Sequence, residues 1–239
     1  MSEQTIALVT GANKGIGYEI AAGLGALGTT VGIGARDPRR GEEAAAKLRA
    51  DGVDAFFVPL DVTDDESVAS AAALVEERFG RLDVLVNNAG IAGEWPTAPS
   101  AATPAVLGKV LDTNVIGVVR VTNAMVPLLR RSARPRIVNQ SSHLSSLTLQ
   151  TSPEVDFGDV DGVYMPSKTF LNAVTVQYAK ELTGIKINAC CPGYVATDFN
   201  GFQGHETPAD GAKIAVRLAT LDDDGPTGGL FDNAGTVPW

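Results

Sequence analysis

The stretch Thr10-Gly11-Ala12-Asn13-Lys14-Gly15-Ile16-Gly17 lies between a short apolar run at 6–9 and a segment of helical periodicity around 20–27. Glycines in such a turn allow positive φ and let a ligand approach the backbone closely. Free N–H groups and the dipole of the following helix favour a phosphate. The spacing differs from that of the P-loop, which requires Gly-Lys followed by Ser or Thr. The turn therefore predicts a dinucleotide site after a first strand, although an ordinary strand-to-helix turn is the alternative.

Outward from this turn, apolar runs of strand length alternate with helical segments. Strands are expected at 6–9, 30–33, 55–60, 82–86, 136–140 and 186–191, with a further short one at 229–231, and helices at 20–27, 44–48, 68–79, 104–129, 166–182 and 208–219. This alternation is typical of a parallel sheet covered by helices on both faces. Because crossovers are right-handed, a doubly wound sheet, the Rossmann fold, is the commonest arrangement. We predict a single α/β domain over residues 1–239.

The composition restricts the classes of function. With 19 basic and 28 acidic residues the net charge is −9, which argues against broad electrostatic binding to nucleic acid or an anionic membrane. No stretch approaches the roughly 18 apolar residues of a membrane span. Cys190 and Cys191 are adjacent in an apolar run and indicate core residues rather than a disulfide framework or a metal site. The sequence predicts a cytoplasmic protein without a metal site.

Positive charge near the end of the second predicted strand bears on the cofactor. That strand ends at Gly34-Ala35-Arg36, in the region about 20 residues beyond the glycines where NAD-binding folds commonly place an acid on the ribose 2′-OH. Arg36, with Lys14 in the turn, suits a 2′-phosphate and favours NADP(H). Two alternatives stay open: Arg36 only begins a polar loop, or Asp37 is the ribose acid. Asp61, before an expected helix start at Thr63, is predicted either to contact the adenine or to cap that helix.

Tyr164 and Lys168 are four positions apart at the start of a predicted helix and therefore share one face. A tyrosine with the ordinary pKa of about 10 is a poor acid–base catalyst near neutrality, and a nearby ammonium lowers that pKa by favouring the phenolate. Pro166 lies between the two and requires the helix to begin there. Upstream, the strand at 136–140 leads to Ser142, whose hydroxyl suits a hydrogen bond to a carbonyl. A solvated helix face and an ordinary turn serine are the alternatives.

Taken together and in order, these motifs resemble the short-chain dehydrogenase/reductase family over almost the whole chain. Asn87-Asn88-Ala89-Gly90 resembles its sheet-stabilising segment, Asn114 its helix asparagine, and Pro192-Gly193 with Thr197 the segment around the nicotinamide. The turn at 10–17, the strand end at 35–37 and the terminal 237–239 look most similar to the carbonyl reductase branch. The chain departs from the family pattern at Gln140, where an aliphatic residue is usual, at His143 and at Pro166. Its stretch from 142 to 164 is much shorter than in animal carbonyl reductases.

The resemblance implies reversible, NADPH-dependent reduction of a ketone or aldehyde. Tyr164 would give the proton, Ser142 would hold and polarise the oxygen, Lys168 would bind the nicotinamide ribose and favour the phenolate, and Asn114 would support a water relay. The residues implied to bind the cofactor are Gly11, Asn13, Lys14, Gly15, Ile16, Gly17, Arg36, Asp61, Val62, Asn88, Ala89, Gly90, Tyr164, Lys168, Pro192, Gly193, Val195 and Thr197.

Three long irregular stretches, 92–103, 143–163 and 195–207, follow predicted strands, where open α/β sheets place their ligands. Their large side chains predict an apolar wall for the substrate. The candidates are Trp95, Leu144, Leu147, Tyr194, Phe199 and Phe202. The alternative for each is that it only anchors its loop to the core. His143 is expected to be a pocket-lining or hydrogen-bonded loop residue, and a second acid–base role is its alternative.

Two other functions fit parts of the same pattern. A reductase of 3-oxoacyl thioesters would use the same residues, but docking an acidic carrier protein needs a basic patch, and a chain of net charge −9 offers little positive surface. A dinucleotide-sensing protein without turnover has no need of all four catalytic candidates. The helices at 104–129 and 166–182 are the surfaces that most family members pair, which favours a homodimer or homotetramer, whereas the acidic stretch 143–163 is placed to block that pairing.

Overall fold

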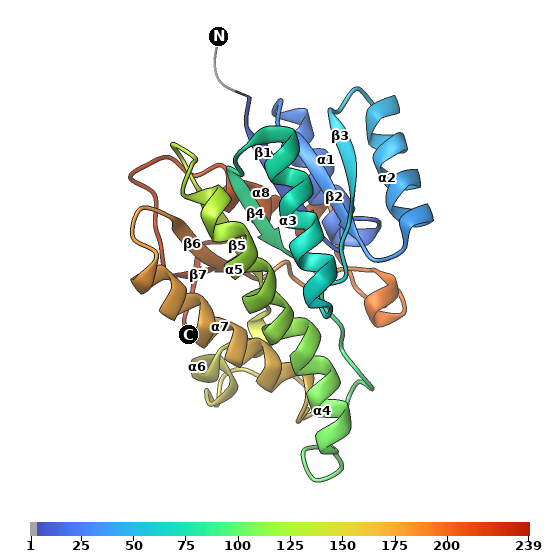
Figure 1. The fold of residues 1–239 in the computed structure, drawn as a ribbon. Helices are drawn as coiled ribbons and strands as arrows, with labels where there is room; N and C mark the ends of the chain where they lie inside the picture. Colours follow the sequence, from blue (N-terminus) through green and yellow to red (C-terminus); the bar gives the residue numbers. More distant parts are fainter. Residues whose placement is uncertain (1–3) are drawn as a thin grey trace.

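The computed structural model describes residues 4–239. Its sheet has the strand order β3-β2-β1-β4-β5-β6-β7-β8 and is parallel except for the last pair (Figure 1). The strands are β1 (Ile6–Thr10), β2 (Thr30–Ala35), β3 (Ala55–Pro59), β4 (Val84–Asn87), β5 (Arg136–Gln140), β6 (Lys186–Cys190), β7 (Leu230–Phe231) and β8 (Thr236–Val237). The predicted doubly wound sheet is confirmed. The sequence did not indicate β8, because two residues carry no readable alternation.

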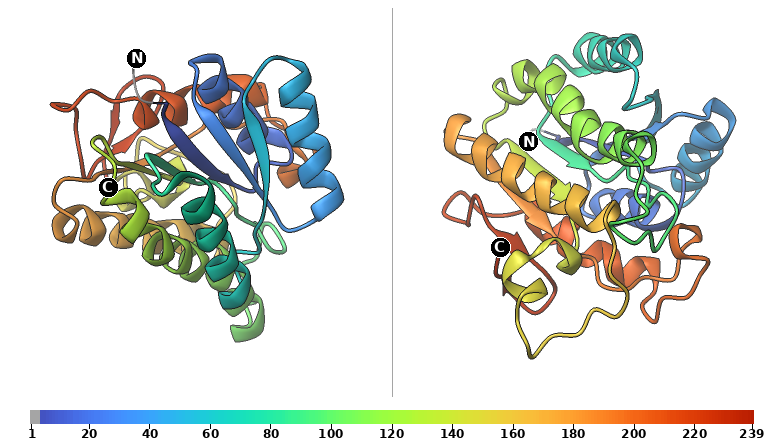
Figure 2. Two further views of the ribbon diagram at one scale, coloured as in Figure 1. Left: turned by 45° about the horizontal axis from the view of Figure 1, so that its top comes forward. Right: turned by 90° about the horizontal axis from the view of Figure 1, so that it is seen from below.

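Helices cover both faces of the sheet (Figures 1 and 2). One face carries α1 (Gly15–Ala26), α2 (Pro38–Ala50) and α8 (Pro208–Ala219), and the other carries α3 (Asp65–Phe79), α5 (Gly117–Leu129) and α7 (Tyr164–Glu181). The helix α4 (Pro104–Leu111) runs on from α5 beyond the sheet, and the short α6 (Leu147–Gln150) precedes α7. Proline at the first turn begins three of these helices, where its missing N–H costs nothing.

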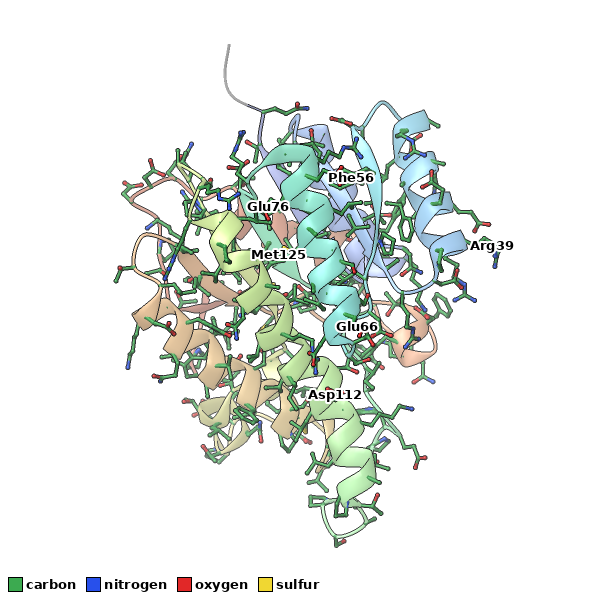
Figure 3. All side chains as sticks on the ribbon, in the orientation of Figure 1. Arg39, Phe56, Glu66, Glu76, Asp112 and Met125 are labelled. Carbon is green, nitrogen blue, oxygen red and sulfur yellow. The ribbon has the colours of Figure 1, made fainter. Side chains whose placement is uncertain are left out.

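A separate apolar core fills each face of the sheet. Val9, Val86 and Val138 pack toward α1 and α8, whereas Leu8, Leu85 and Ile137, their neighbours along the strands, pack toward α3, α5 and α7. Phe56 of β3 and Met125 of α5, labelled in Figure 3, belong to the second core, while Arg39 of α2 reaches into solvent. Strands buried on both faces need continuous apolar runs, which is why these segments lack a polar alternation.

The predicted helix at 104–129 is interrupted by one wide turn. Residues Asp112–Ile116 form a π-helical turn between α4 and α5, and its buried side chains include Asn114. A π-turn shifts the angular position of every residue beyond it, and such turns are frequent at functional sites. The periodicity of the sequence identified one helix here and missed the turn within it.

The carboxyl ends of the parallel strands meet along one edge of the sheet. The strand order runs outward in opposite directions from β1 and β4, so the crevice between these two strands is the switch point where open α/β sheets bind ligands. Segments far apart in the sequence therefore converge there. These are the glycine turn after β1, Arg36 after β2, Asn88 after β4, Ser142 after β5 and Pro192 after β6.

Candidate active site

The glycine turn after β1 packs closely against the segment 87–90, which leaves no room for a side chain at two of its glycines. Gly11 has φ +64°, and a Cβ added at Gly17 would lie 2.4 Å from Nδ2 of Asn88 and 2.6 Å from the carbonyl oxygen of Gly11. Asn88 itself donates from Nδ2 to the carbonyl oxygen of Thr10 at 2.9 Å, and Thr10 accepts at Oγ1 from the backbone of Asn88 and Ala89. The segment 87–90 thus fixes the turn and leaves its backbone accessible, which suits a phosphate.

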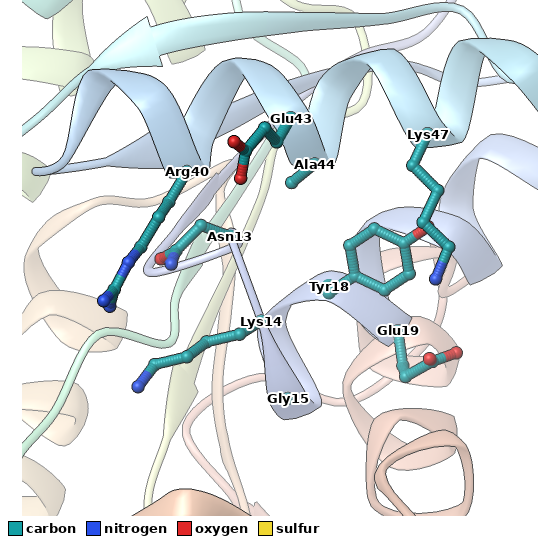
Figure 4. A pocket seen from close by; sticks show the side chains of 9 residues that line it. All are labelled: Asn13, Lys14, Gly15, Tyr18, Glu19, Arg40, Glu43, Ala44 and Lys47. Atoms are coloured by element: carbon teal, nitrogen blue, oxygen red, sulfur yellow. The ribbon is translucent and has the colours of Figure 1, made fainter.

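A cavity of about 410 Å³ opens beside this turn, between α1 and α2. Its lining consists of Asn13, Lys14, Gly15, Tyr18, Glu19, Arg40, Glu43, Ala44 and Lys47. Figure 4 shows Lys14 and Arg40 extending in the same direction with Asn13 between them. Arg40 was not singled out from the sequence, although Asp37 and Pro38 as cap and first residue of α2 place it one turn into that helix.

The polar side chains after β2 and β3 have partners within the chain. Asp37 caps α2 by accepting from the backbone N–H of Arg40 at 3.1 Å, while Arg36 is exposed. Asp61 accepts from the backbone N–H of Thr63 at 3.0 Å and from its hydroxyl at 2.7 Å. Although burial acts to raise the pKa of Asp61, these bonds lower it. The expected helix start at Thr63 is wrong by two residues, because Asp64 caps α3 and the helix begins at Asp65.

Lys14 forms an ion pair with Asp198, which lies after β6 in the segment 195–207. Both side chains are about half exposed. The pair therefore links the glycine turn to the irregular stretch on the other side of the crevice. Nothing in the sequence pattern indicated Asp198.

Tyr164 and Lys168 share the first two turns of α7, as predicted, with Pro166 in the first turn. The Nζ of Lys168 is buried and donates to the backbone oxygen of Gln140 at 2.7 Å. It also lies 5.7 Å from the centre of the Tyr164 ring. Helix α7 thereby brings the tyrosine and the ammonium to the end of β5, next to Ser142.

Burial moves the pKa values of both side chains. Removal from water lowers the pKa of Lys168 to about 8, because it disfavours the ammonium. The same effect raises the pKa of the half-buried Tyr164, and a side-chain hydrogen bond with Ser142 opposes it. At neutral pH the tyrosine is therefore the protonated, acidic partner and the lysine carries a charge.

Asn114 projects from the π-helical turn and is fully buried. Its side-chain amide exchanges two 2.9 Å hydrogen bonds with the backbone of Ile91, and Nδ2 also donates to the hydroxyl of Ser167 at 3.0 Å. A Cβ on Gly90 would lie 3.3 Å from Oδ1 of Asn114 and 3.5 Å from Nζ of Lys168. Asn114 thus joins the segment after β4 to α7, close to the lysine.

The segment after β6 contains the remaining expected cofactor residues. Gly193 has φ +88°, and Val195 and Thr197 are buried. Thr197 caps a short 3₁₀ turn over Asp198–Asn200, and a Cβ added at Gly15 would lie 3.4 Å from its methyl group. Two further expected cofactor residues lie outside this segment. Ile16 packs against the first core and Val62 belongs to the second, so their side chains contribute to the packing of the fold.

Two of the predicted apolar wall residues contact the tyrosine directly. Trp95 and Phe199 each meet the Tyr164 ring edge-on, with ring centres 5.5 Å apart. Both are nearly half exposed, as is Tyr194, which instead packs against His205. Leu147 and Phe202 are exposed and Leu144 is partly buried. The aromatic side chains of 92–103 and 195–207 thus flank the hydroxyl-bearing ring.

His143, the residue after Ser142, is paired with Asp232. Its Nε2 lies 2.9 Å from Oδ2 of Asp232, and the other carboxylate oxygen accepts from the backbone of Ala234 and Gly235. Although burial acts to raise the pKa of Asp232, the hydrogen bond with His143 and those from the backbone lower it. The sequence did not indicate Asp232.

Other features of the described residues bear on the chemistry. Cys190 and Cys191 are free and buried, as expected, and burial raises the pKa of Cys190 to about 12, which keeps its thiol protonated at neutral pH. Within residues 4–239, no three side chains gather as metal ligands do. In the same range, none of the helices has the length and apolar character needed to cross a bilayer.

Comparison with known proteins gives one consistent result. The family model described as "short chain dehydrogenase" matches residues 5–207. Salutaridine reductase of Papaver bracteatum is 34% identical over 97% of this chain and 95% of its own length. Carbonyl reductase [NADPH] 1 of Bos taurus is 32% identical over 100% and 99%, respectively. The NADPH-bound carbonyl reductase from chicken fatty liver superposes with a TM-score of 0.86, at 30% identity, over 99% of this chain and 100% of that one.

Proposed function

Since the chain belongs to the short-chain dehydrogenase/reductase family and is an NAD(P)-dependent oxidoreductase that acts on carbonyls, we propose that it reduces an apolar ketone or aldehyde to an alcohol with NADPH. The observation that carries this proposal is the convergence of Tyr164, Lys168 and Ser142 at the end of β5, with Trp95 and Phe199 edge-on to the tyrosine ring.

The residues around the crevice fit a dinucleotide. Neither Gly11 nor Gly17 has room for a Cβ. Because both positions lack side chains, phosphate oxygens can approach the backbone of the turn closely. Lys14 and Arg40 supply positive charge at the cavity beside that turn, and Arg36 follows the adjacent strand. These cations support a preference for the cofactor with a 2′-phosphate. When bound, the reduced nicotinamide supplies a hydride to the carbonyl carbon.

The chain's own residues act on the carbonyl oxygen. Ser142 donates a hydrogen bond to it, and Tyr164 transfers its phenolic proton as negative charge develops there. The buried ammonium of Lys168 stabilises the phenolate that remains, because a nearby positive charge favours the ionised form. Asn114 keeps the segment after β4 fixed against α7 through Ile91 and Ser167, and a water relay beside it returning the proton stays a prediction.

A screen of carbonyl compounds tests this function. NADPH oxidation would be followed with aldehydes, ketones and 3-oxoacyl thioesters of increasing apolar size, each against the Tyr164→Phe variant as background. We expect turnover of bulky apolar carbonyls above short hydroxylated or carboxylated ones. Selective turnover of the thioesters would favour the thioester reductase instead. Binding of NADPH without any turnover would identify a dinucleotide sensor and overturn the proposal.

Assembly into a homodimer or homotetramer remains part of the proposal. Ile116, in the π-turn before α5, and Phe170, on α7, are about half exposed, at 48% and 53%. Both lie on the two helical stretches expected to pair. Light scattering at micromolar concentration is expected to give a multiple of the 24.8 kDa chain mass, and a mass of one chain would contradict this.

A further inference from the structure

The side chain of Gln140 contains a buried hydrogen-bond donor that no group of the described chain satisfies. Gln140 is the last residue of β5 and only 6% exposed. Its Oε1 accepts from Sγ of Cys190 at 2.9 Å, and its backbone oxygen accepts from Nζ of Lys168 at 2.7 Å. Its Nε2, in contrast, has no hydrogen-bond partner within residues 4–239.

An unpaired buried amide is costly to keep. Leaving such a donor unsatisfied costs the desolvation of the amide with no hydrogen bond in return, whereas an aliphatic side chain at this position has no such cost. The bond from Cys190 occupies only Oε1, and the apolar core that contains Val138, two positions earlier on the same face, has no use for the Nε2 donor. The donor therefore indicates a partner from outside the chain.

The position of Gln140 identifies the kind of partner. Side chains at alternate positions of a strand share a face, so Gln140 lies on the face of Val138, which packs in one cluster with Ala12 of the glycine turn and with Cys190. Gln140 is in register with Cys190, two residues before Pro192-Gly193. Lys168 contacts its backbone from the other side. The free donor thus lies at the crevice edge, between the glycine turn and the segment after β6.

We propose that the side-chain amide of Gln140 donates a hydrogen bond to the nicotinamide of the bound cofactor. This assignment rests on the proposed function and adds to it a residue that binds the hydride-donating end of the dinucleotide. The adenosine half, which carries the 2′-phosphate, contacts the cations of the cavity beside α2 and is not touched by Gln140.

The test compares two ligands on one variant by isothermal titration calorimetry. The ligands are NADPH and 2′-phospho-ADP-ribose, which lacks only the nicotinamide. Gln140→Met keeps the length of the side chain and removes the donor. We expect a loss of about 10-fold in affinity for NADPH, the size of one lost hydrogen bond in a buried site, and unchanged affinity for 2′-phospho-ADP-ribose. Gln177→Met, at an exposed position of α7, is the matched control.

Thermal unfolding without ligand separates a binding role from a structural one. Because Gln140→Met removes an unpaired donor, the variant is expected to melt at or above the temperature of the wild type. Gln140→Leu is a second variant, should methionine disturb the packing. Equal loss for both ligands, or no loss for either, would overturn the assignment. If the wild type binds neither ligand, the proposed function itself fails, which is a different result from unchanged binding by the variants.

Discussion

The buried ammonium of Lys168 lies 5.7 Å from the centre of the Tyr164 ring, four residues back on α7. Burial acts in opposite directions on the two pKa values, lowering that of the lysine to about 8 and raising that of the tyrosine. Any change that removes the charge from Lys168 therefore leaves Tyr164 a weaker acid. This relationship makes the pH dependence of the reaction predictable in sign.

We expect kcat/KM for carbonyl reduction to fall as the pH rises through about 8. The lysine pKa near 8 means that the ammonium is present below that pH and lost above it, and kcat/KM reports the ionisation of the free enzyme. A rate profile from pH 6 to 10 checks this. Lys168→Arg, whose guanidinium stays charged over this range, is expected to lose the decline. A profile that rises through pH 8 to 9 would contradict the role of the lysine.

Tyr164→Phe is expected to lower turnover at least about 10²-fold, because it removes the proton donor with little change in volume. Folding and the affinity for NADPH should persist. Circular dichroism and calorimetry check these two points. Tyr178→Phe is the matched control, since that tyrosine lies on the same helix and its hydroxyl donates to Asn123 at 2.7 Å, away from the crevice. Near-normal turnover by the Tyr164 variant would exclude it as the acid.

Two arginines are expected to carry the preference for NADPH over NADH. Arg36→Ala and Arg40→Ala should each reduce the ratio of kcat/KM for the two cofactors about 10-fold, since a charge-assisted hydrogen bond to a phosphate contributes about 1.5–3 kcal/mol. Arg39→Ala is the control, because that arginine is exposed and pairs with Glu43 on the same helix. If the wild type instead prefers NADH, Asp37 is the ribose acid and the assignment of Arg36 is wrong.

Asp198→Asn is expected to tighten NADPH binding by about threefold. The substitution releases Lys14 from its exposed ion pair, and such pairs contribute at most about 1 kcal/mol. The freed ammonium is then available to a cofactor phosphate. Fluorescence titration measures the change, and Asp210→Asn, which breaks an exposed pair with Lys213, is the control. Weaker binding by the Asp198 variant would show that this carboxylate supports the site rather than competing for Lys14.

The sequence predicts those parts of the molecule that short-range rules determine. The apolar runs, the glycine turn and the spacing of Tyr164 and Lys168 depend on neighbouring residues, so the sheet and α7 were predicted close to their observed bounds. The partners that meet across the crevice were not predictable in this way. Lys14 and Asp198 are 184 positions apart, and His143 and Asp232 are 89 apart. No local pattern encodes such pairs, because the packing of whole elements brings them together.

Arg40 and the π-turn were missed for a different reason. Arg36 was predicted to bind the cofactor because it directly follows β2. Asp37 caps α2, however, and the first turn of this helix places Arg40 at the cavity. The π-turn leaves the apolar periodicity on both sides intact, so the sequence still reads as one helix. In both cases the information is present locally, but its effect depends on a change in chain direction.

The edge-on contact between Trp95 and Tyr164 makes the site optically observable. Trp95 and Trp239 are the two tryptophans of the chain. Reduced nicotinamide absorbs in the near ultraviolet where indole emits, so a cofactor bound beside Tyr164 would quench Trp95 by energy transfer. In a Trp239→Phe background the emission comes from Trp95 alone, and each binding event at the crevice becomes a change in intrinsic fluorescence that needs no added label.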